Sequence, residues 1–213
     1  MSKVVAILNQ KGGSGKTTIA TNLAHAFQLE GHKVLLVDSD PQGSARDWNA
    51  ASDAALLPVI GMDRPTLSKD IQAVLNNHDL VIIDGAPQIA ELAIAAIKCA
   101  DIVLIPVQPS PYDIWACEDL VDIIKARQEV TDGKPKVAFV ISRVIKNTQL
   151  SKEIREALEG YELPVFTNFT SQRVIYAKSA ATGSTVLGSE NQGEAANEIR
   201  AIANELKGFM SWH

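Results

Sequence analysis

The sequence contains few cysteines and no long apolar run. Its 213 residues include two cysteines, Cys99 and Cys117, which lie in apolar surroundings and lack the spacing of metal ligands. This excludes a disulfide framework and predicts reduced core residues of a cytosolic protein. No apolar run approaches the ~18 residues that a membrane-spanning helix needs, so we expect a soluble protein without stable membrane association.

The chain also lacks an excess of basic residues. It has 20 Lys and Arg against 25 Asp and Glu, for a net charge of −5. This excludes a polycation, so any binding of nucleic acid would need a local basic patch on an acidic background. The first predicted strand begins within four residues of Met1, which leaves no room for a signal peptide.

Internal repeats, low-complexity tracts and linkers are absent as well. The hydrophobic share of 46% is enough for a sizeable core, which excludes a disordered chain. Chains of about this length commonly form one large domain, so we expect residues 1–213 to form a single domain.

Apolar segments alternate with segments of helical periodicity along the chain. We expect strands over residues 4–8, 33–37, 57–60, 80–84, 102–107, 137–142 and 164–166. We expect helices over residues 19–29, 45–51, 66–75, 89–99, 114–130, 150–159 and 194–210, and a loop-to-helix segment over 171–178. Strands separated by helices are typical of βαβ units, so the sequence predicts an α/β fold whose twisted, mostly parallel sheet has helices on both faces.

A glycine-rich turn lies between the first predicted strand and the first predicted helix. Its residues are Lys11, Gly12, Gly13, Ser14, Gly15, Lys16, Thr17 and Thr18, preceded by Asn9 and Gln10. Glycines let backbone N–H groups approach a phosphate chain, and the helix N-terminus adds partial positive charge. Lys16 would supply a cation for the terminal phosphates, and the Thr17 hydroxyl a ligand for Mg²⁺. The flanking strand and helix favour this P-loop NTPase-type interpretation over a flexible Gly/Ser turn.

The turn departs from the general phosphate-loop pattern G-x-x-x-x-G-K-[ST] at one position. The first glycine of that pattern should fall at position 10, where the chain has Gln10. A second lysine, Lys11, directly precedes Gly12. From the residues alone, the alternative explanation of Lys11 is a solvated loop residue.

Three aspartates lie at or just after the ends of two predicted strands. Asp38 and Asp40 follow one apolar run, and strand alternation puts them on the same side, facing the crevice where ligands bind in open α/β sheets. Asp84 ends a second apolar run and has the form of a Walker B aspartate, which holds Mg²⁺ directly or through water. The alternatives are a helix-capping turn for the first pair and a common strand end for Asp84. The phosphate loop upstream favours the functional interpretation.

In order and spacing, these motifs resemble the deviant Walker A ATPases of the ParA/MinD family. Residues 10–18 resemble the family's Walker A loop, residues 38–43 its A′ motif and residues 80–84 its Walker B strand. Asn9-Gln10 before the lysine, and the Asp-x-Asp-Pro-Gln-Gly turn, are more similar to the ParA branch than to MinD. The similarity extends over nearly the whole chain, including residues 106–111. We expect no N-terminal helix-turn-helix of the kind found in longer plasmid ParA proteins.

The resemblance implies a role for each motif residue. Lys11 would reach across a face-to-face homodimer to the partner's ATP, so that dimerisation depends on bound nucleotide. Lys16 and Thr17 would hold the phosphates and Mg²⁺, Asp40 would orient the attacking water, and Asp38 and Asp84 would support the metal. The catalytic set is thus Lys11, Lys16 and Asp40, and the metal set Thr17, Asp38 and Asp84. We find no arginine close to these motifs, so we expect slow basal ATP hydrolysis that a partner stimulates.

The resemblance also implies a cellular task. The preferred hypothesis is partition of a plasmid or chromosome by an ATP-bound dimer that binds DNA non-specifically on the nucleoid. A centromere-binding partner, similar to ParB or ParG, would stimulate hydrolysis and release it. The candidates for DNA phosphate contacts are Arg173, Lys178, Arg200 and Lys207. Each of them is also explained as an ordinary solvated cation.

Three alternatives stay open. The same dimer could position a protein cargo, such as a carboxysome or a chemoreceptor cluster, on the nucleoid. A MinD-like regulator of division would need a membrane-binding tail, but the polar face of the predicted last helix is not basic. A metabolic P-loop enzyme such as dethiobiotin synthetase is disfavoured by Lys11 and the Asp-Pro-Gln turn. The sequence does not specify which residues contact adenine, and Ser142-Arg143, at a strand end, is the candidate position to examine.

Overall fold

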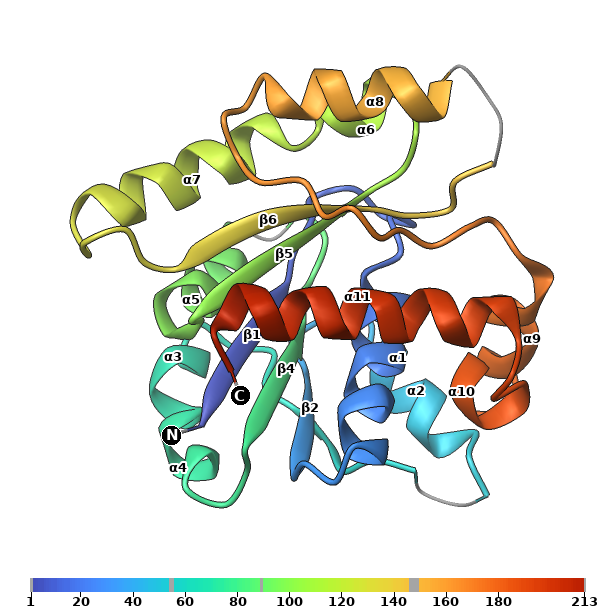
Figure 1. The fold of residues 1–213 in the computed structure, drawn as a ribbon. Coiled ribbons are helices and arrows are strands. Elements are labelled where there is room, and N and C mark those ends of the chain that lie inside the picture. The colour runs from blue at the N-terminus through green and yellow to red at the C-terminus, as the bar shows by residue number, and fades with distance from the viewer. Residues whose placement is uncertain (1, 54–55, 89, 146–149, 213) are drawn as a thin grey trace.

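A parallel sheet of six strands forms the centre of the computed structural model, which describes residues 2–53, 56–88, 90–145 and 150–212. The strands are β1 (Lys3–Ile7), β2 (Val34–Asp38), β3 (Val59–Gly61), β4 (Leu80–Asp84), β5 (Ile102–Val107) and β6 (Lys136–Ile141). Their spatial order is β3-β2-β4-β1-β5-β6, and all neighbouring strands run parallel. The predicted α/β sheet is confirmed (Figure 1).

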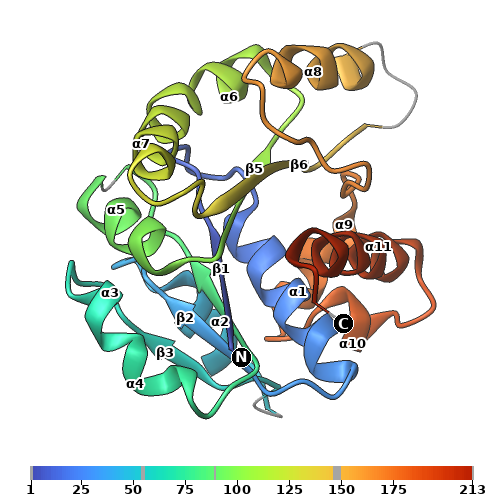
Figure 2. The same cartoon turned by 60° about the vertical axis from the view of Figure 1, so that its left-hand side comes forward.

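Helices cover both faces of the sheet, as Figure 2 shows. On one face lie α1 (Lys16–Leu29), α2 (Ser44–Ala50), α9 (Val174–Ala180), α10 (Val186–Ser189) and α11 (Glu194–Met210). On the other lie α3 (Leu67–Asp70), α4 (Gln72–Leu75), α5 (Ala90–Cys99), α6 (Pro111–Trp115), α7 (Glu118–Glu129) and α8 (Leu150–Glu159).

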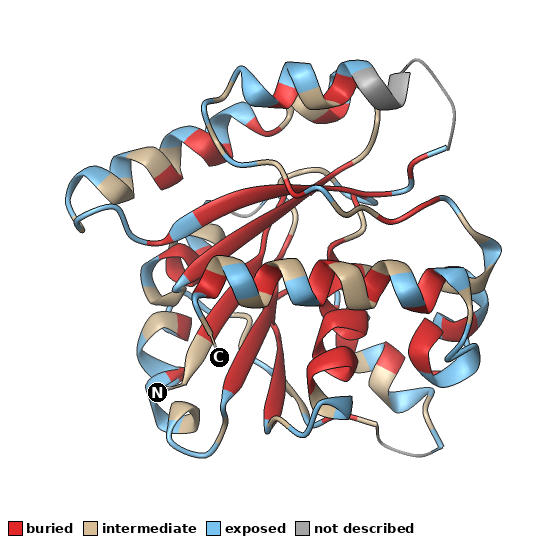
Figure 3. Cartoon of the chain, in the orientation of Figure 1, coloured by how far each residue is buried: buried red, intermediate tan, exposed pale blue. Residues whose placement is uncertain are grey.

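The strands are buried on both faces because alternate residues join two separate cores. On β1, Val5 and Ile7 pack in the core under α1 and α11, whereas Val4 and Ala6 pack in the core under α5 and α7. A strand with two buried faces needs apolar residues at every position, which explains its continuous apolar run. Figure 3 shows the buried strands between the two helical layers.

The last helix closes the first of these cores. Ile199, Ile202 and Leu206 of α11 are buried against α1. Beyond the helix, the Trp212 ring stacks on His32 with the ring centroids 4.4 Å apart. In the part of the chain that the structure describes, no helix has the length and apolar character needed to cross a membrane.

The prediction of one continuous helix over residues 114–130 is wrong, because the helix starts earlier and is interrupted. It begins at Pro111, whose fixed φ suits the first turn of a helix, and divides into α6 and α7. At the division the Cys117 N–H donates to the Ile114 carbonyl, three residues back, at 3.0 Å. This tighter turn interrupts the α-helical hydrogen bonding.

Two further predictions are corrected. The helix predicted over residues 66–75 divides at Ile71 into α3 and α4. The strand predicted over residues 164–166 makes one isolated bridge, between Val165 and Phe139 of β6. Pro164 has no N–H to donate, which limits how far this segment can extend the sheet.

Candidate nucleotide site

The strand order brings the predicted loop and carboxylates to one edge of the sheet. Asp84, the last residue of β4, is the register partner of Ile7 on β1 and of Asp38 on β2. Because the strands are parallel, the segments after Ile7, Asp38 and Asp84 leave the sheet at the same carboxyl edge. Ligands bind at this edge in open α/β sheets, which makes it the candidate site.

Backbone geometry and two side chains shape the glycine-rich loop. The angle φ is +78° at Gly13 and +98° at Gly15, in the left-handed region that favours glycine. Gln108 Nε2 donates to the Gly13 carbonyl at 2.6 Å, and Ser142 Oγ donates to the Ser14 carbonyl at 2.8 Å. These bonds fix the loop beside the N-terminus of α1, whose first N–H groups have no partner within the helix and attract an anion.

Lys16 lies inside this arrangement. It is 7% exposed, and its Nζ donates to the Lys11 carbonyl at 3.1 Å. Burial lowers the pKa of Lys16, and the carboxylates of Asp84 and Asp40 oppose that shift. The structure therefore brings Lys16 together with two of the three predicted aspartates.

Asp84 has the properties of an unsatisfied metal ligand. It is fully buried, and neither carboxylate oxygen has a hydrogen-bond partner among the described residues. Burial raises the pKa of Asp84 to about 7, while the neighbouring Thr17 hydroxyl and the Lys16 ammonium oppose the rise. A buried carboxylate beside a threonine hydroxyl offers the hard oxygen ligands that Mg²⁺ prefers. Thr17 and Asp84 thus fit the predicted metal.

A metal held by the protein alone does not fit this site. The described parts of the chain contain no cluster of three or more His, Cys, Asp or Glu side chains that could hold an ion. Mg²⁺ is usually held by one or two protein ligands together with substrate phosphates and waters. The pair of Thr17 and Asp84 therefore points to a metal that enters with a nucleotide.

Asp38 is engaged differently from its register partner Asp84. Its Oδ1 accepts the Asp40 N–H at 3.0 Å, and its Oδ2 accepts the Arg46 N–H at 2.9 Å. Both oxygens of this fully buried carboxylate therefore bind the turn that follows β2. In the described contacts Asp38 holds the turn, and its role in metal binding stays a prediction.

Asp40 lies at the start of that turn. Its Oδ1 accepts the Gln42 N–H at 2.9 Å, and its carbonyl accepts the Gly43 N–H at 2.9 Å. Gly43 has a φ of +72° and caps the N-terminus of α2. The turn thus has a defined conformation with the Asp40 carboxylate close enough to Lys16 to influence its pKa.

The expectation that no arginine lies close to the motifs is wrong. Arg46 lies in the first turn of α2, and its side chain extends back over the turn after β2. There Arg46 Nη2 donates to the Asp40 carbonyl at 2.9 Å. Its Nε lies 3.4 Å from Asp38 Oδ2. The A′ motif ends at Gly43, so motif matching stopped before this residue. The helix predicted over residues 45–51 was the available signal, because it places Arg46 in the first turn after the motif.

Sequence reasoning also missed the partner of Lys11. The Lys11 ammonium forms an ion pair with Asp113 of α6, and the Asp113 side chain is 3% exposed. Asn9 supports the pair, because its Oδ1 accepts the Lys11 N–H at 2.8 Å and its Nδ2 donates to the Pro106 carbonyl at 2.7 Å. Pro111, which begins α6, was the signal that a helix starts beside the loop.

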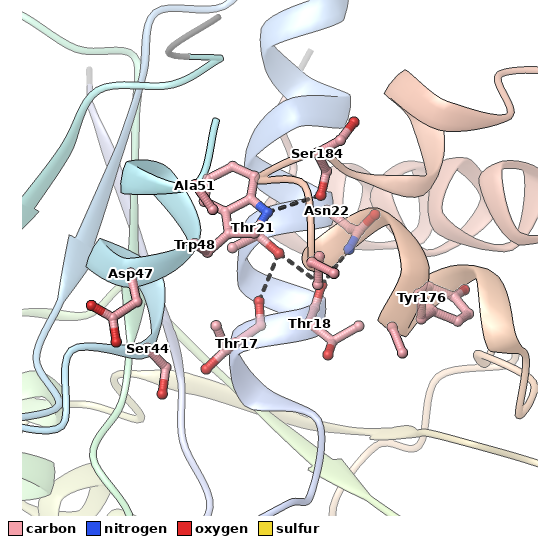
Figure 4. Close-up of a pocket in the computed structure, with 13 residues that line it drawn as sticks. Thr17, Thr18, Thr21, Asn22, Ser44, Asp47, Trp48, Ala51, Tyr176 and Ser184 are labelled. Carbon is pink, nitrogen blue, oxygen red and sulfur yellow. Dashed lines mark hydrogen bonds between the residues drawn. The ribbon is translucent and has the colours of Figure 1, made fainter. Parts of the chain in front are cut away.

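Two cavities flank the first turns of α1. One, of about 260 Å³, is lined by residues that include Gly15, Thr18, Ser142, Arg143 and Tyr176. Ser142-Arg143, the candidate position for adenine, is part of this lining. The other, of about 380 Å³, lies between α1, α2 and α9, with Trp48 and Tyr176 on opposite walls (Figure 4). Thr18 and Tyr176 line both cavities.

The four predicted DNA-contacting cations lie in and around α9 and α11, and they differ in their surroundings. Arg173 forms ion pairs with Glu194 and Glu198, the latter at 2.9 Å. Lys207 pairs with Glu30 at 2.7 Å. The structure thus places most of these cations against other protein groups. The remaining arginine, Arg200, donates to the Asn191 carbonyl at 2.8 Å, whereas Lys178 is exposed.

The chain is similar in sequence to a known family and to several known proteins. The family described as the CobQ/CobB/MinD/ParA nucleotide binding domain matches residues 5–186. The chain is 34% identical over 210 residues to the maintenance of carboxysome distribution protein A of Halothiobacillus neapolitanus, with 95% of each chain covered. It is 25% identical over 249 residues to the sporulation initiation inhibitor protein Soj of Bacillus subtilis, covering 97% of this chain and 98% of Soj.

A solved structure has the same fold. The ATP complex of a single-substitution variant of Cyanothece McdA matches with a TM-score of 0.78 at 17% sequence identity, covering 100% of this chain and 97% of that chain. This agreement extends over the sheet and both helical layers.

Proposed function

The chain belongs to the CobQ/CobB/MinD/ParA family of nucleotide-binding proteins, among its ParA/MinD ATPases, and we propose that it uses ATP to position a protein cargo on the nucleoid. The sequence alone favoured partition of DNA. The 34% identity to a carboxysome distribution protein, against 25% to Soj, supports the cargo hypothesis better. The cargo would be a large protein assembly such as a carboxysome.

The main support for ATP hydrolysis is the buried carboxylate of Asp84, which has no hydrogen-bond partner among the described residues and lies beside Lys16 and Thr17. Phosphoryl transfer asks mainly for positioning and for stabilisation of charge. Mg²⁺ bound with the nucleotide would neutralise charge on the β- and γ-phosphates. Lys16 would bind those phosphates, Thr17 and Asp84 would hold the ion, and Asp40 would orient the attacking water.

The second lysine makes the site depend on two subunits. Lys11 reaches the partner's phosphates in an ATP-bound homodimer, and it must first leave Asp113. Basal hydrolysis is slow, and a partner protein on the cargo raises it by ordering a missing group. Hydrolysis then separates the subunits.

The dimer binds DNA without sequence preference. Lys178 is the best supported contact, because Arg173 and Lys207 are already paired with glutamates. Dimerisation doubles the number of exposed cations on one assembly, so an acidic chain binds DNA only in its ATP state. Such binding is electrostatic and weakens steeply with salt.

Deletion of the gene in its own host, with fluorescently tagged cargo, tests this function. We expect the cargo to collapse into one or a few clusters, and a variant of Asp84 to behave like the deletion. Evenly spaced cargo in the deletion strain would contradict the proposal. Purified protein that transfers phosphate to a small metabolite would contradict it as well.

Partition of DNA remains the second candidate, because the chain also resembles Soj over nearly its whole length. In that case the deletion strain would lose plasmids or produce cells without DNA, while protein assemblies stay spaced. The stimulating partner would then be a centromere-binding protein of the ParB or ParG type. A MinD-like role predicts instead that ATP makes the protein sediment with liposomes.

A further inference from the structure

Arg46 spans the turn that carries both aspartates of the A′ motif. Its backbone N–H donates to Asp38 Oδ2 at 2.9 Å, and its Nη2 donates to the Asp40 carbonyl at 2.9 Å. The same Nη2 lies 3.3 Å from Asp63 Oδ2, on the segment after β3. One side chain therefore connects the end of β2, the turn and the neighbouring loop.

Two glycines make room for the guanidinium. A Cβ at Gly43 would lie 3.2 Å from Arg46 Nε, and a Cβ at Gly61 would lie 3.0 Å from Arg46 Nη1. Both distances are tighter than ordinary van der Waals contact. The guanidinium thus fits into a slot between the start of α2 and the end of β3.

The contacts of Arg46 are directed at the protein and not at a ligand. Its guanidinium binds Asp38, the carbonyl of Asp40 and Asp63, so three oxygens of the chain already engage it. An arginine held in this way does not swing freely onto a phosphate. Its effect on chemistry must pass through the groups that it holds.

We propose that Arg46 is the positioning residue for the Asp40 carboxylate, which it holds in place by clamping the turn of residues 38–43. The inference rests on the proposed role of Asp40 in ATP hydrolysis. A planar guanidinium can donate in several fixed directions at once, which an ammonium cannot. The turn needs this fork because its two acceptors, Asp38 Oδ2 and the Asp40 carbonyl, lie on different residues.

Steady-state ATP hydrolysis by Arg46→Met and Arg46→Lys tests the proposal. We expect kcat to fall at least ~10-fold in both variants while KM for ATP changes less than ~3-fold, because a small displacement of a catalytic group acts on the chemical step. Arg64→Met, which removes an exposed arginine outside the slot, should match the wild type. Arg46→Met activity within twofold of the wild type would overturn the proposal.

The Asp40→Ala background separates positioning from direct catalysis. If Arg46 acts through Asp40, Arg46→Met lowers the single-turnover rate no further in Asp40→Ala. An equal loss in both backgrounds would overturn the proposal, because Arg46 would then act independently of Asp40.

Gly61→Ala provides a variant that keeps the arginine. Its methyl group crowds the guanidinium without removing it, and the fall in kcat should resemble that of Arg46→Lys. Unchanged kcat in Gly61→Ala, together with lowered thermal stability in Arg46→Met, would make Arg46 merely structural and overturn the proposal. A wild-type protein that fails to hydrolyse ATP would instead refute the proposed function.

Discussion

Lys11 forms an ion pair with Asp113 of the same chain, and the carboxylate is almost completely buried on α6. The second oxygen of Asp113 has no hydrogen-bond partner in the described structure. In the proposed dimer Lys11 has to leave Asp113, so the pair would oppose dimerisation until ATP offers Lys11 a stronger acceptor.

Asp113→Asn should make dimerisation easier. The substitution keeps the shape of the side chain but removes the charge that retains Lys11, so half-maximal dimerisation should need less ATP. The expected decrease is roughly three- to tenfold, equivalent to about 1 kcal/mol for a partly exposed ion pair. Analytical ultracentrifugation over a series of ATP concentrations measures it.

Asp119→Asn is the matched control, because Asp119 is an exposed acid nearby on α7. It should dimerise at the same ATP concentration as the wild type. An Asp113→Asn protein that needs as much ATP as the wild type, or more, would show that the pair does not restrain Lys11.

Asp84 should make the nucleotide-free protein less stable as the pH rises. Its pKa is raised to about 7 in the folded chain, against an ordinary aspartate pKa of 3.8. Between these values the folded state binds more protons than the unfolded state, so the free energy of unfolding falls with rising pH and levels off above pH 7. From pH 5.5 to 7.5 the loss from this one group is about 2 kcal/mol.

Urea unfolding of the wild type and of Asp84→Asn at both pH values isolates this contribution. The other titrating groups are shared, so the wild type should lose about 2 kcal/mol more than the variant over the interval. An identical pH dependence in the two proteins would mean that Asp84 is ionised throughout, contrary to its buried surroundings.

Lys178→Ala should weaken the binding of DNA by the ATP-bound protein. Lys178 is exposed, and a dimer carries two copies, so the slope of log K against log salt concentration should become shallower by about 2. Fluorescence anisotropy with duplexes of unrelated sequence measures this slope. Lys69→Ala, on the opposite face of the sheet, should keep it. Equal slopes for Lys178→Ala and the wild type would remove Lys178 from the interface.

Local sequence patterns predicted what depends on local structure. The strand that ends at Asp84 was predicted with its observed bounds, because a strand buried on both faces needs a continuous apolar run. The phosphate loop was recognised because glycine, lysine and threonine must occur at fixed spacing to surround phosphates. The register that pairs Asp38 with Asp84 was not predicted, because strand patterns do not specify which strands are neighbours in the sheet.

Contacts between distant segments could not be predicted in the same way. Lys11 and Asp113 are separated by 102 residues, and nothing in either segment specifies the other. Arg46 was missed for a different reason, since its role comes from the direction of α2 and from the room left by Gly43 and Gly61. Periodicity reports which face of an element is buried, and not which charged groups meet.

The proposed two-subunit site is tested most directly by measuring the mass of Lys11→Ala in solution with Mg²⁺ and a non-hydrolysable ATP analogue. We predict that the wild type and Lys69→Ala become dimers under these conditions, whereas Lys11→Ala binds the analogue but stays monomeric by light scattering. A Lys11→Ala protein that dimerises as fully as the wild type would contradict the role of Lys11 across the interface.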